Sequence, residues 1–253
     1  MNASAQPISG QDLRSWRERY RGETKGQIVH GSLHGREGWT RSHVLCAGGA
    51  ACGYGSGALS GPWDGRPTVF EYHVAPEHRS RAFALFEALL AASGARHFEV
   101  QSNDGLLTVM LHAYGRDVVS EKIVSEDRIA TVLGGGGALR VRETTEAEDR
   151  ACIARRQGGS IWRLKLGGSA VARGGTNFHY NPPYADVYME VDAGSRRRGL
   201  GSYLVQELKR VAYELGQIPC ARCDTANLPS RRTLLRAGFA PCGHILLGRI
   251  AEA

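Results

Sequence analysis

The sequence predicts an α/β fold built as two similar domains in tandem, each with a central sheet flanked by helices. Some stretches alternate apolar and polar residues, as strands do, and others have apolar residues at helical spacing. The two kinds of stretch follow one another along the chain. This strand–helix–strand–helix order recurs after about 120 residues, which is too long a period for a solenoid. Four consecutive glycines at 134–137 separate the two copies. We therefore predict domains at residues 1–134 and 138–253, joined by a flexible connector.

The clearest helix of the first half is predicted at residues 79–92, where Phe83, Phe86 and Leu90 fall on one face. Short alternating stretches bounded by glycine or proline are expected to be strands. The predicted elements of this half are strands at 43–46, 53–59, 69–74 and 97–101 and helices at 11–20, 79–92 and 106–114.

The second half repeats this order. Thr144 followed by early acidic residues is typical of a helix start, because the hydroxyl and the carboxylates satisfy the first amides. Leu204, Leu208 and Leu215 recur at helical spacing up to Gly216, which favours a helix end. Strands are expected at 138–142, 161–166, 170–173, 185–191 and 220–224, and a last helix ends near residue 238.

One turn of the second half has the features of an anion site. The strand ending at Val191 is followed by Asp-Ala-Gly-Ser-Arg196-Arg197-Arg198-Gly199-Leu200-Gly201-Ser202 and then by a helix. A turn that opens a helix leaves amide N–H groups unpaired, and the helix dipole favours negative charge there. The glycines carry no side chain to block an anion, and the arginines add forked donors. A phosphate or diphosphate would suit this turn.

The glycine spacing matches neither the P-loop nor the dinucleotide-binding fingerprint. Instead, Arg196-x-x-Gly199-x-Gly201 resembles the acetyl-coenzyme A signature of the GNAT superfamily of N-acetyltransferases. Asn227-Leu-Pro-Ser230, followed by Gly238-Phe239, is similar to the second block of that family. A basic turn without a ligand is the alternative for the first block taken alone. The resemblance covers residues 138–253 well and 40–125 faintly.

The resemblance implies a mixed, mostly antiparallel central sheet in each domain and acetyl-CoA (coenzyme A) as cosubstrate. In the family, two neighbouring strands splay apart and the pantetheine arm lies between them. Carried over by position, Val191 and Ala193 would offer backbone to pantetheine, and Asn227 with Ser230 or Arg231 would contact the arm or the nucleotide. The diphosphate would be held by Arg196, Arg197, Arg198, Gly199, Leu200, Gly201 and Ser202.

The first half aligns on the second without gaps in this region, from Val74 and Arg79 onto Val191 and Arg196. It has Ala82 and Ala84, however, where the second half has its two glycines, and two methyl groups would crowd a diphosphate. We therefore interpret residues 1–134 as a degenerate copy that stabilises or shapes the second. The alternative is that this copy binds coenzyme in a looser way.

The general base is harder to assign. The acceptor amine must lose a proton before it attacks the thioester. In relatives, this group often projects from one face of the central strand. Here that face carries Ala185, Val187 and Met189, and none of these side chains titrates. Asp186, Tyr188 and Glu190 lie on the opposite face, and a β-bulge of the kind common in the family could turn one of them inward. Glu190 is our first candidate, with Tyr188 beside it. Second candidates are the loop residues His179, Tyr180 and Tyr184.

The resemblance also sets an expectation that the sequence does not meet. Many members have a tyrosine seven residues after the asparagine to protonate the leaving thiolate, and Leu234 stands here. We expect direct transfer in a ternary complex, because Cys220 and Cys223 have no activating neighbour in sequence. The expected activity is acetyl transfer to a primary amine of an unidentified small-molecule or peptide acceptor. The alternative is a non-catalytic acyl-CoA-binding sensor or scaffold protein.

Composition narrows the partners. The net charge is +7, and all but four of the 32 basic residues are arginines, which suits an anionic ligand such as coenzyme A. No basic stripe interleaved with aromatic residues appears, so we expect no nucleic-acid partner. No stretch approaches the roughly 18 apolar residues of a membrane span, and no secretory leader pattern is present. We expect a monomer or homodimer.

The six cysteines are dispersed, which is typical of free thiols in a reducing cytoplasm. Cys220, Cys223, Cys242 and His244 could be drawn as a zinc site. The first two, however, lie three apart in a predicted strand and therefore point to opposite faces. We expect no metal.

Overall fold

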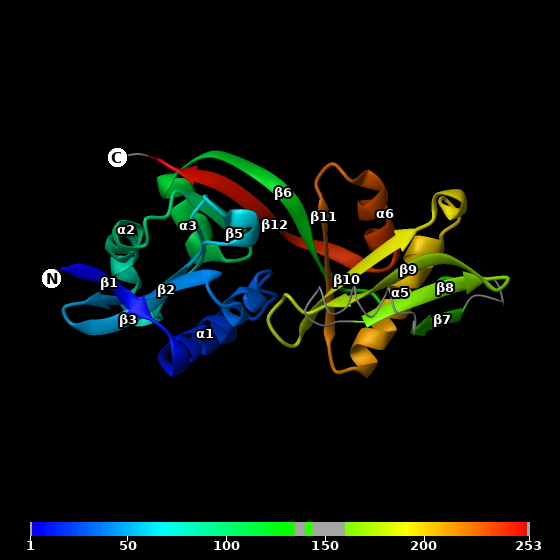
Figure 1. Cartoon of the computed structure of the whole chain (residues 1–253), viewed down its shortest axis with the longest axis horizontal. Helices are drawn as coiled ribbons and strands as arrows, with labels where there is room; N and C mark the ends of the chain where they lie inside the picture. The colour runs from blue at the N-terminus through cyan, green and yellow to red at the C-terminus, as the bar shows by residue number, and fades with distance from the viewer. Residues whose placement is uncertain (1, 135–139, 144–159, 252–253) are drawn as a thin grey trace. The chain divides into compact units, whose positions relative to one another are not determined.

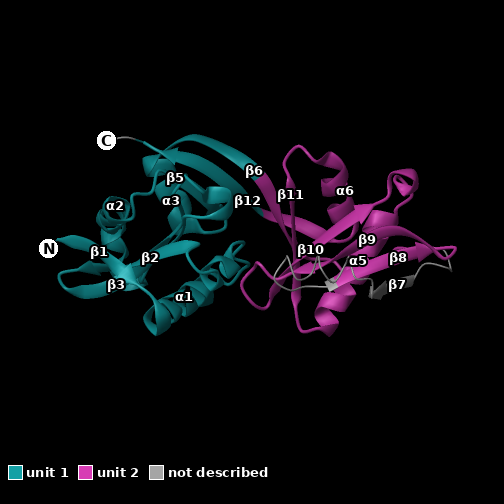
Figure 2. Cartoon of the chain, in the orientation of Figure 1, with its two compact units in different colours: residues 1–121, 243–253 teal, residues 122–242 magenta. Residues whose placement is uncertain are grey.

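The computed structural model describes residues 2–134, 140–143 and 160–251 of the 253-residue chain (Figure 1). The predicted helix start at Thr144 and most of the glycine run lie outside the described residues. The chain divides into two compact units (Figure 2). Unit 1 contains residues 1–121 and 243–253, and unit 2 contains residues 122–242.

Unit 1 is a mixed sheet with helices packed against it. The strand order is β1-β2-β3-β4-β5-β12, antiparallel except for the parallel pair β4–β5. Its strands are β1 (Ala3–Ile8), β2 (Thr40–Ala47), β3 (Ala50–Ala58), β4 (Thr68–Val74), β5 (His97–Gln101) and the later part of β12 (Phe239–Ile250). Its helices are α1 (Gly10–Thr24), α2 (Ala82–Ser93) and α3 (Gly105–Tyr114), with short 3-10 turns η1 (Gly31–Gly35), η2 (Gly61–Trp63) and η3 (Pro76–Arg81).

Unit 2 has the same plan. Its strand order is β6-β11-β10-β9-β8-β7, with β10–β11 as the parallel pair and antiparallel pairs elsewhere. The strands are the later part of β6 (Gly115–Asp127), β7 (Arg140–Glu143), β8 (Ser160–Leu166), β9 (Ser169–Asn177), β10 (Tyr184–Val191) and β11 (Ile218–Asp224). The described helices are η4 (Ala193–Ser195), α5 (Leu200–Glu214) and α6 (Leu228–Arg236). The predicted fold class, a mixed and mostly antiparallel sheet flanked by helices in each of two copies, is confirmed.

Each unit has its own apolar core. In unit 1, Phe86 of α2 stacks on Phe98 of β5 with ring centroids 5.8 Å apart, and Tyr72 of β4 meets Phe86 edge-on at 4.9 Å. In unit 2, Leu204 and Leu208 of α5 are fully buried against β9, β10 and β11. Leu204 and Leu208, predicted from their helical spacing, thus lie on the buried face of α5, whereas Leu215 is 58% exposed at the C-cap of the helix.

Unit 1 also holds a buried carboxylate. Glu71 of β4 is fully buried and accepts hydrogen bonds from Tyr54 (2.9 Å) and His34 (2.8 Å), while Arg17 Nε lies 3.6 Å away. Burial alone would raise the pKa of Glu71, but the charges of His34 and Arg17 and the two hydrogen bonds outweigh it and lower the pKa to about 2. The group therefore joins β3, β4, α1 and η1 as a charged centre.

Two strands are shared between the halves of the sequence. β12 comes from the end of the chain, and its residues 245–249 pair with β5 of unit 1. β6 precedes the glycine run, and its residues 122–126 pair with β11 of unit 2. Each unit thus contains a strand from the other half of the sequence. The predicted boundaries at 134 and 138 stay a prediction, because residues 135–139 lie outside the described residues.

We expect Ile245→Ala to loosen unit 1, although residue 245 belongs to the predicted C-terminal domain. Ile245 is 2% exposed, and truncating a buried isoleucine costs about 2–5 kcal/mol. Hydrogen exchange should show faster exchange of the β5 amides. Arg249→Ala, at an exposed position of the same strand, is the control. Unchanged β5 protection in Ile245→Ala would contradict the pairing.

We expect Glu71→Gln to remove acid sensitivity from unit 1. The folded pKa lies below the ordinary value of 4.5, so the stabilisation is complete above pH 4.5 and is lost as the pH falls through 2. The variant should lose roughly 3 kcal/mol of unfolding free energy at pH 7 and show a flatter stability profile between pH 4.5 and 2. Denaturant unfolding across this range tests it, with the exposed Glu87→Gln as control.

Candidate functional site

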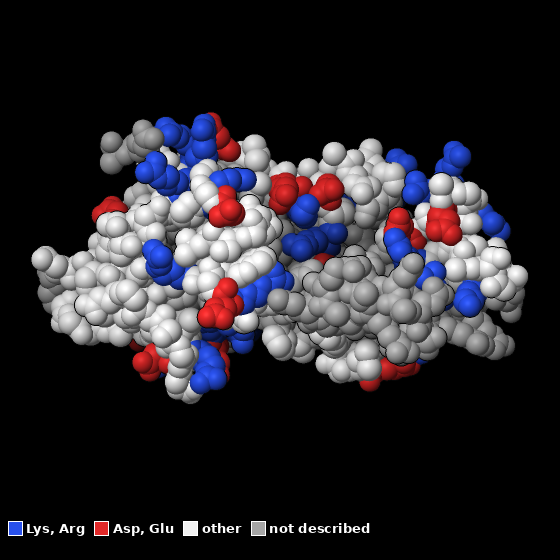
Figure 3. Space-filling model, in the orientation of Figure 1, with Lys and Arg blue, Asp and Glu red and all other residues white. Residues whose placement is uncertain are grey.

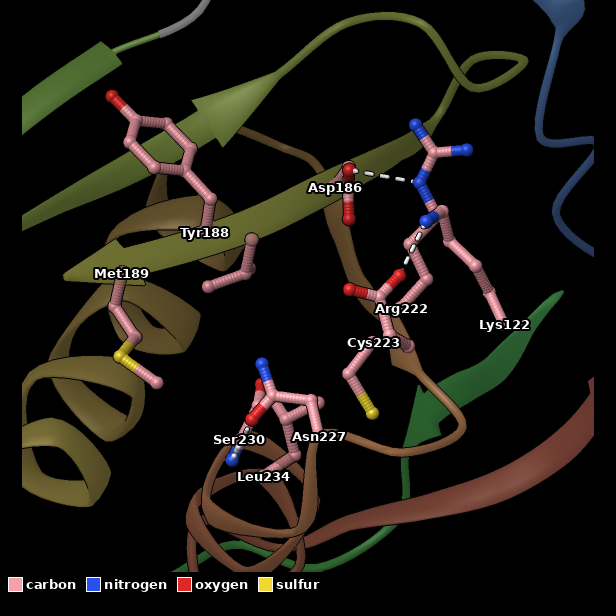
Figure 4. A pocket seen from close by; sticks show the side chains of 11 residues that line it. Lys122, Asp186, Tyr188, Met189, Arg222, Cys223, Asn227, Ser230 and Leu234 are labelled. Atoms are coloured by element: carbon pink, nitrogen blue, oxygen red, sulfur yellow. Dashed lines mark hydrogen bonds and ion pairs between the residues drawn. The ribbon is translucent and has the colours of Figure 1, made fainter.

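A cavity opens in unit 2 where two parallel strands separate. β10 and β11 pair only from Tyr184–Asp186 to Ile218–Cys220, and the rest of β10 pairs with β9 alone. Beyond this point lies a cavity of about 270 Å³ (Figure 4). It is lined by Lys122, Asp186, Val187, Tyr188, Met189, Arg222, Cys223, Asp224, Asn227, Ser230 and Leu234. An open strand edge of this kind can pair with an extended ligand.

The predicted anion turn is open in the structure. Arg197 (φ 61°) and Gly199 (φ 78°) both adopt the left-handed conformation, and Gly199 is the N-cap of α5. The side chains of Arg196, Arg197 and Arg198 are exposed around it. Arg196 Nε donates to the Val191 carbonyl at 3.0 Å, which fixes its side chain at the end of β10. The turn therefore combines outward amides with three cations.

The two glycines of the motif have different physical roles. A Cβ at Gly199 would meet only the Arg236 guanidinium at 3.7 Å, so that position needs glycine for its backbone angle. A Cβ at Gly201 would lie 3.3 Å from Thr233 and 3.4 Å from Val191. Gly201 therefore lets α5 approach β10 and α6 closely, rather than making room for an anion.

The other residues predicted to bind coenzyme lie in three different places: at the cavity, on the surface and in the core. Asn227 caps α6 by accepting from the Ser230 amide at 3.1 Å, and both side chains lie at the cavity in Figure 4. Arg231 is exposed and is not part of the lining. Leu200 and Ser202 are buried, so only their backbone faces the turn; Val191 is half-buried and Ala193 exposed.

Of the two predicted catalytic residues, only Tyr188 lines this cavity. Glu190 is exposed and forms an ion pair with Arg173 of β9 at 2.8 Å. Tyr188 lines the cavity, with its ring on the side of β10 opposite Met189 (Figure 4). The register between β9 and β10 is continuous from Asp186 to Val191, so the expected β-bulge is wrong for these residues.

A different polar cluster lies at the cavity. Asp186 of β10 is buried, and its Oδ2 lies 2.7 Å from His179 Nε2 and 3.6 Å from Arg222 Nε. Tyr180 donates to Asp186 Oδ1 at 3.4 Å. Asp186 of β10 therefore brings together His179 and Tyr180, two of the second candidates for the base. The sequence offered one sign of this role. Asp186 is a carboxylate near the start of the strand that leads into the predicted anion turn.

Three titratable groups near this cluster have raised pKa values. Burial, reinforced by the charge on Asp186, raises the pKa of Tyr180 well above its ordinary value, so its phenol stays protonated. Burial also raises the pKa of the Cys220 and Cys223 thiols. Leu234 is buried in the cavity wall and offers no proton. Neither described cysteine of β11 has the lowered pKa of a nucleophilic thiol.

The corresponding turn of unit 1 differs in a way that fits the alanine substitutions. Arg79 Nε donates to the Val74 carbonyl at 3.3 Å, as Arg196 does to Val191, which supports the alignment of the two copies. η3, however, runs directly into α2, and no residue from 75 to 84 has a positive φ. Ala82 is buried in the core. The open anion turn is therefore missing from unit 1.

Charge and metal features add few constraints. On the face drawn in Figure 3, basic side chains are interspersed with acidic ones rather than gathered in one stripe. In the part of the chain that the structure describes, no group of three or more histidine, cysteine or acidic side chains is arranged to hold a metal ion. Within the same residues, no helix is long and apolar enough to cross a membrane.

Comparisons with known proteins support the resemblance. Residues 136–239 match the family model described as Acetyltransferase (GNAT) family. No curated protein matches the chain.

Several solved structures share the fold of the whole chain. One is an acetyltransferase from the GNAT family of Colwellia psychrerythraea (13% identity, 98% of this chain and 100% of that one, TM-score 0.73). Another is a tandem GNAT protein from the clavulanic acid biosynthesis pathway (16% identity, 100% of both chains, TM-score 0.65). A third is a GCN5-related N-acetyltransferase from Sphaerobacter thermophilus (15% identity, 98% and 95%, TM-score 0.61).

Proposed function

Because residues 136–239 match the family model of GNAT acetyltransferases, we propose that this protein transfers the acetyl group of acetyl-CoA to a primary amine, using the unit 2 cavity. The observation that carries the proposal is the position of the open turn at Arg197 and Gly199. It follows directly on β10, the strand whose free edge borders the cavity. A ligand with a diphosphate and an extended, amide-containing arm would use both features at once.

We propose that the turn amides and Arg196, Arg197 and Arg198 hold the diphosphate of the coenzyme. The free edge of β10 up to Val191, with Ala193 just beyond it, offers backbone groups to the pantetheine arm. Asn227 and Ser230 contact that arm from the start of α6, and Arg231 is left for the nucleotide. The acetyl group then lies between the separated strands, near Asp186.

For the base, we propose Asp186 with His179 in place of Glu190 and Tyr188. Asp186 lies on the face of β10 opposite Val187 and Met189, and the separation of the strands opens this face to the cavity. His179 Nε2 lies 2.7 Å from Asp186 Oδ2 and 3.2 Å from Arg222 Nη2. In the tautomer that donates Nε2–H to Asp186, Nδ1 is an acceptor for the amine proton. Glu190 is held by Arg173 on the exposed part of β9.

We propose that the amine attacks the thioester directly in a ternary complex. The raised thiol pKa values of Cys220 and Cys223 remove the two nearby candidates for an acyl-enzyme. No acid replaces the tyrosine position occupied by Leu234. An ordinary thiol pKa near 8.5 allows the leaving group to depart as thiolate without a dedicated donor.

The second candidate function is a non-catalytic acyl-CoA sensor or scaffold. It is favoured by Leu234 in the cavity wall, where an acid would otherwise stand. Release of free thiol across a panel of small-molecule and peptide amines separates the two functions. Stabilisation by acetyl-CoA without turnover on any amine would favour the sensor.

We expect Gly199→Glu to weaken acetyl-CoA binding at least tenfold while the fold survives. The side chain would strain the left-handed turn and place a carboxylate where the phosphates bind. Calorimetric titration with acetyl-CoA tests this.

The matched control is Gly216→Glu, which introduces the same charge and a similar strain (φ 71°) beyond the other end of α5. It should bind normally. Equal affinity of the Gly199 variant and the wild type would rule out this placement of the diphosphate.

We expect Asp186→Asn and His179→Gln each to lower kcat by about 10²–10⁴-fold, as loss of a general base does. Coenzyme affinity should stay within a few-fold, because the diphosphate turn is untouched. Glu190→Gln should keep near-normal kcat, since an exposed ion pair contributes at most about 1 kcal/mol. The measurement is thiol release with an amine from the panel. The opposite ranking, with Glu190→Gln inactive, would return the role to Glu190.

A further inference from the structure

Unit 1 contains a cavity of its own that the acetyl-transfer proposal does not use. β4 and β5 pair in parallel only at Thr68 with His97 and Val69 with Phe98. Beyond these pairs lies a cavity of about 460 Å³, bounded by β4, the start of α3 and the last turns of α1. It is larger than the unit 2 cavity of about 270 Å³.

This cavity lacks the features that a diphosphate needs. Pro76 has no N–H, and the backbone of residues 75–84 contains no left-handed residue that would turn its amides outward. Its one lining arginine, Arg79, is already engaged by the Glu23 carboxylate and the Val74 carbonyl. The chemistry of the lining therefore differs from that of unit 2.

The polar lining includes a buried carboxylate and an asparagine whose side-chain oxygen is buried. Asp104 is 5% exposed, and its carboxylate accepts from two neutral donors, the Tyr20 hydroxyl (2.6 Å) and the Leu107 amide (3.1 Å). Asn103 Oδ1 is buried without a hydrogen-bond partner. Buried carboxylates are normally paired with a cation.

The pKa values around the cavity agree with a missing positive charge. Burial, only partly offset by the hydrogen bonds from Tyr20 and Leu107 and reinforced by the charge of Glu71, raises the pKa of Asp104 to about 6. Burial, together with Arg19, lowers the pKa of His73 to about 4, so that this ring is neutral at pH 7. The aromatic walls therefore add no positive charge.

We infer that the unit 1 cavity binds an organic ammonium ion. The Asp104 carboxylate would pair with its charge, Asn103 Oδ1 would accept one of its N–H groups, and the Tyr20, Tyr72 and His73 rings would pack against its carbon skeleton. Carboxylates combined with aromatic rings are the usual surroundings of bound ammonium groups. This site lies in unit 1 and does not depend on the acetyl-transfer proposal.

The test uses three probes of the same shape and different charge. These are tyramine (cation), tyrosol (neutral) and 3-(4-hydroxyphenyl)propionate (anion), titrated at pH 7.5 and followed by amide chemical shifts of the Asn103–Val109 region. We expect tyramine to bind at least tenfold more tightly than tyrosol, and the propionate most weakly. Equal binding of the three probes, or a preference for the anion, would overturn the inference.

Asp104→Asn localises the effect. Asparagine keeps the N-cap of α3, so the fold should be retained. The preference for tyramine over tyrosol should fall at least tenfold. Asp224→Asn, at the rim of the unit 2 cavity, should leave this preference unchanged. A tyramine preference that survives in Asp104→Asn would also contradict the assignment.

One further arm tests the competing occupant. In Gly199→Glu protein, whose unit 2 turn is blocked, acetyl-CoA should not displace tyramine from the unit 1 cavity. Displacement there would assign the cavity to coenzyme and overturn the ammonium site.

Discussion

The candidate site depends on the point at which β10 and β11 stop pairing. Three residue pairs hold these parallel strands together, and beyond them each strand has neighbours only on its outer side. Contacts of α5 with its neighbours hold the surrounding elements in place. Gly201 lets α5 approach β10 and α6 within van der Waals distance, and the buried Lys209 donates to the Ile129 and Ala237 carbonyls at 2.9 and 2.7 Å. The gap between β10 and β11 is therefore bordered by well-packed elements of unit 2.

The same gap explains why both faces of β10 reach one cavity. In a continuous sheet, Asp186 and Met189 would face opposite compartments, because their side chains alternate. Once the neighbouring strand has left, a ligand lying in the gap contacts residues of both parities. The proposed coenzyme contacts and the proposed base can then lie on the same strand, β10. The arginines lie at its end, and the Asp186 cluster lies at its beginning.

Much of this could be predicted from the sequence, because the signals are local. Helical spacing identified α5, and the glycine–arginine spacing located the turn that the structure shows at Arg197 and Gly199. The polar cluster could not be predicted in the same way. His179 reaches Asp186 through the course of a loop, and the choice of Glu190 rested on a bulge that the register with β9 excludes. Long-range strand pairing, such as β12 with β5, leaves no periodic trace in the sequence at all.

The two shared strands offer a reason why unit 1 is retained although it lacks the anion turn. Had the duplication left two self-sufficient domains, the first could be deleted once its turn closed. Instead, the last residues of the chain complete the sheet of unit 1, and residues 122–126 complete the sheet of unit 2. Removing either half of the gene would leave the other with an unpaired strand edge, which invites aggregation. Loss of either half would therefore cost the other a strand of its sheet, so that the two copies depend on one another for their folds.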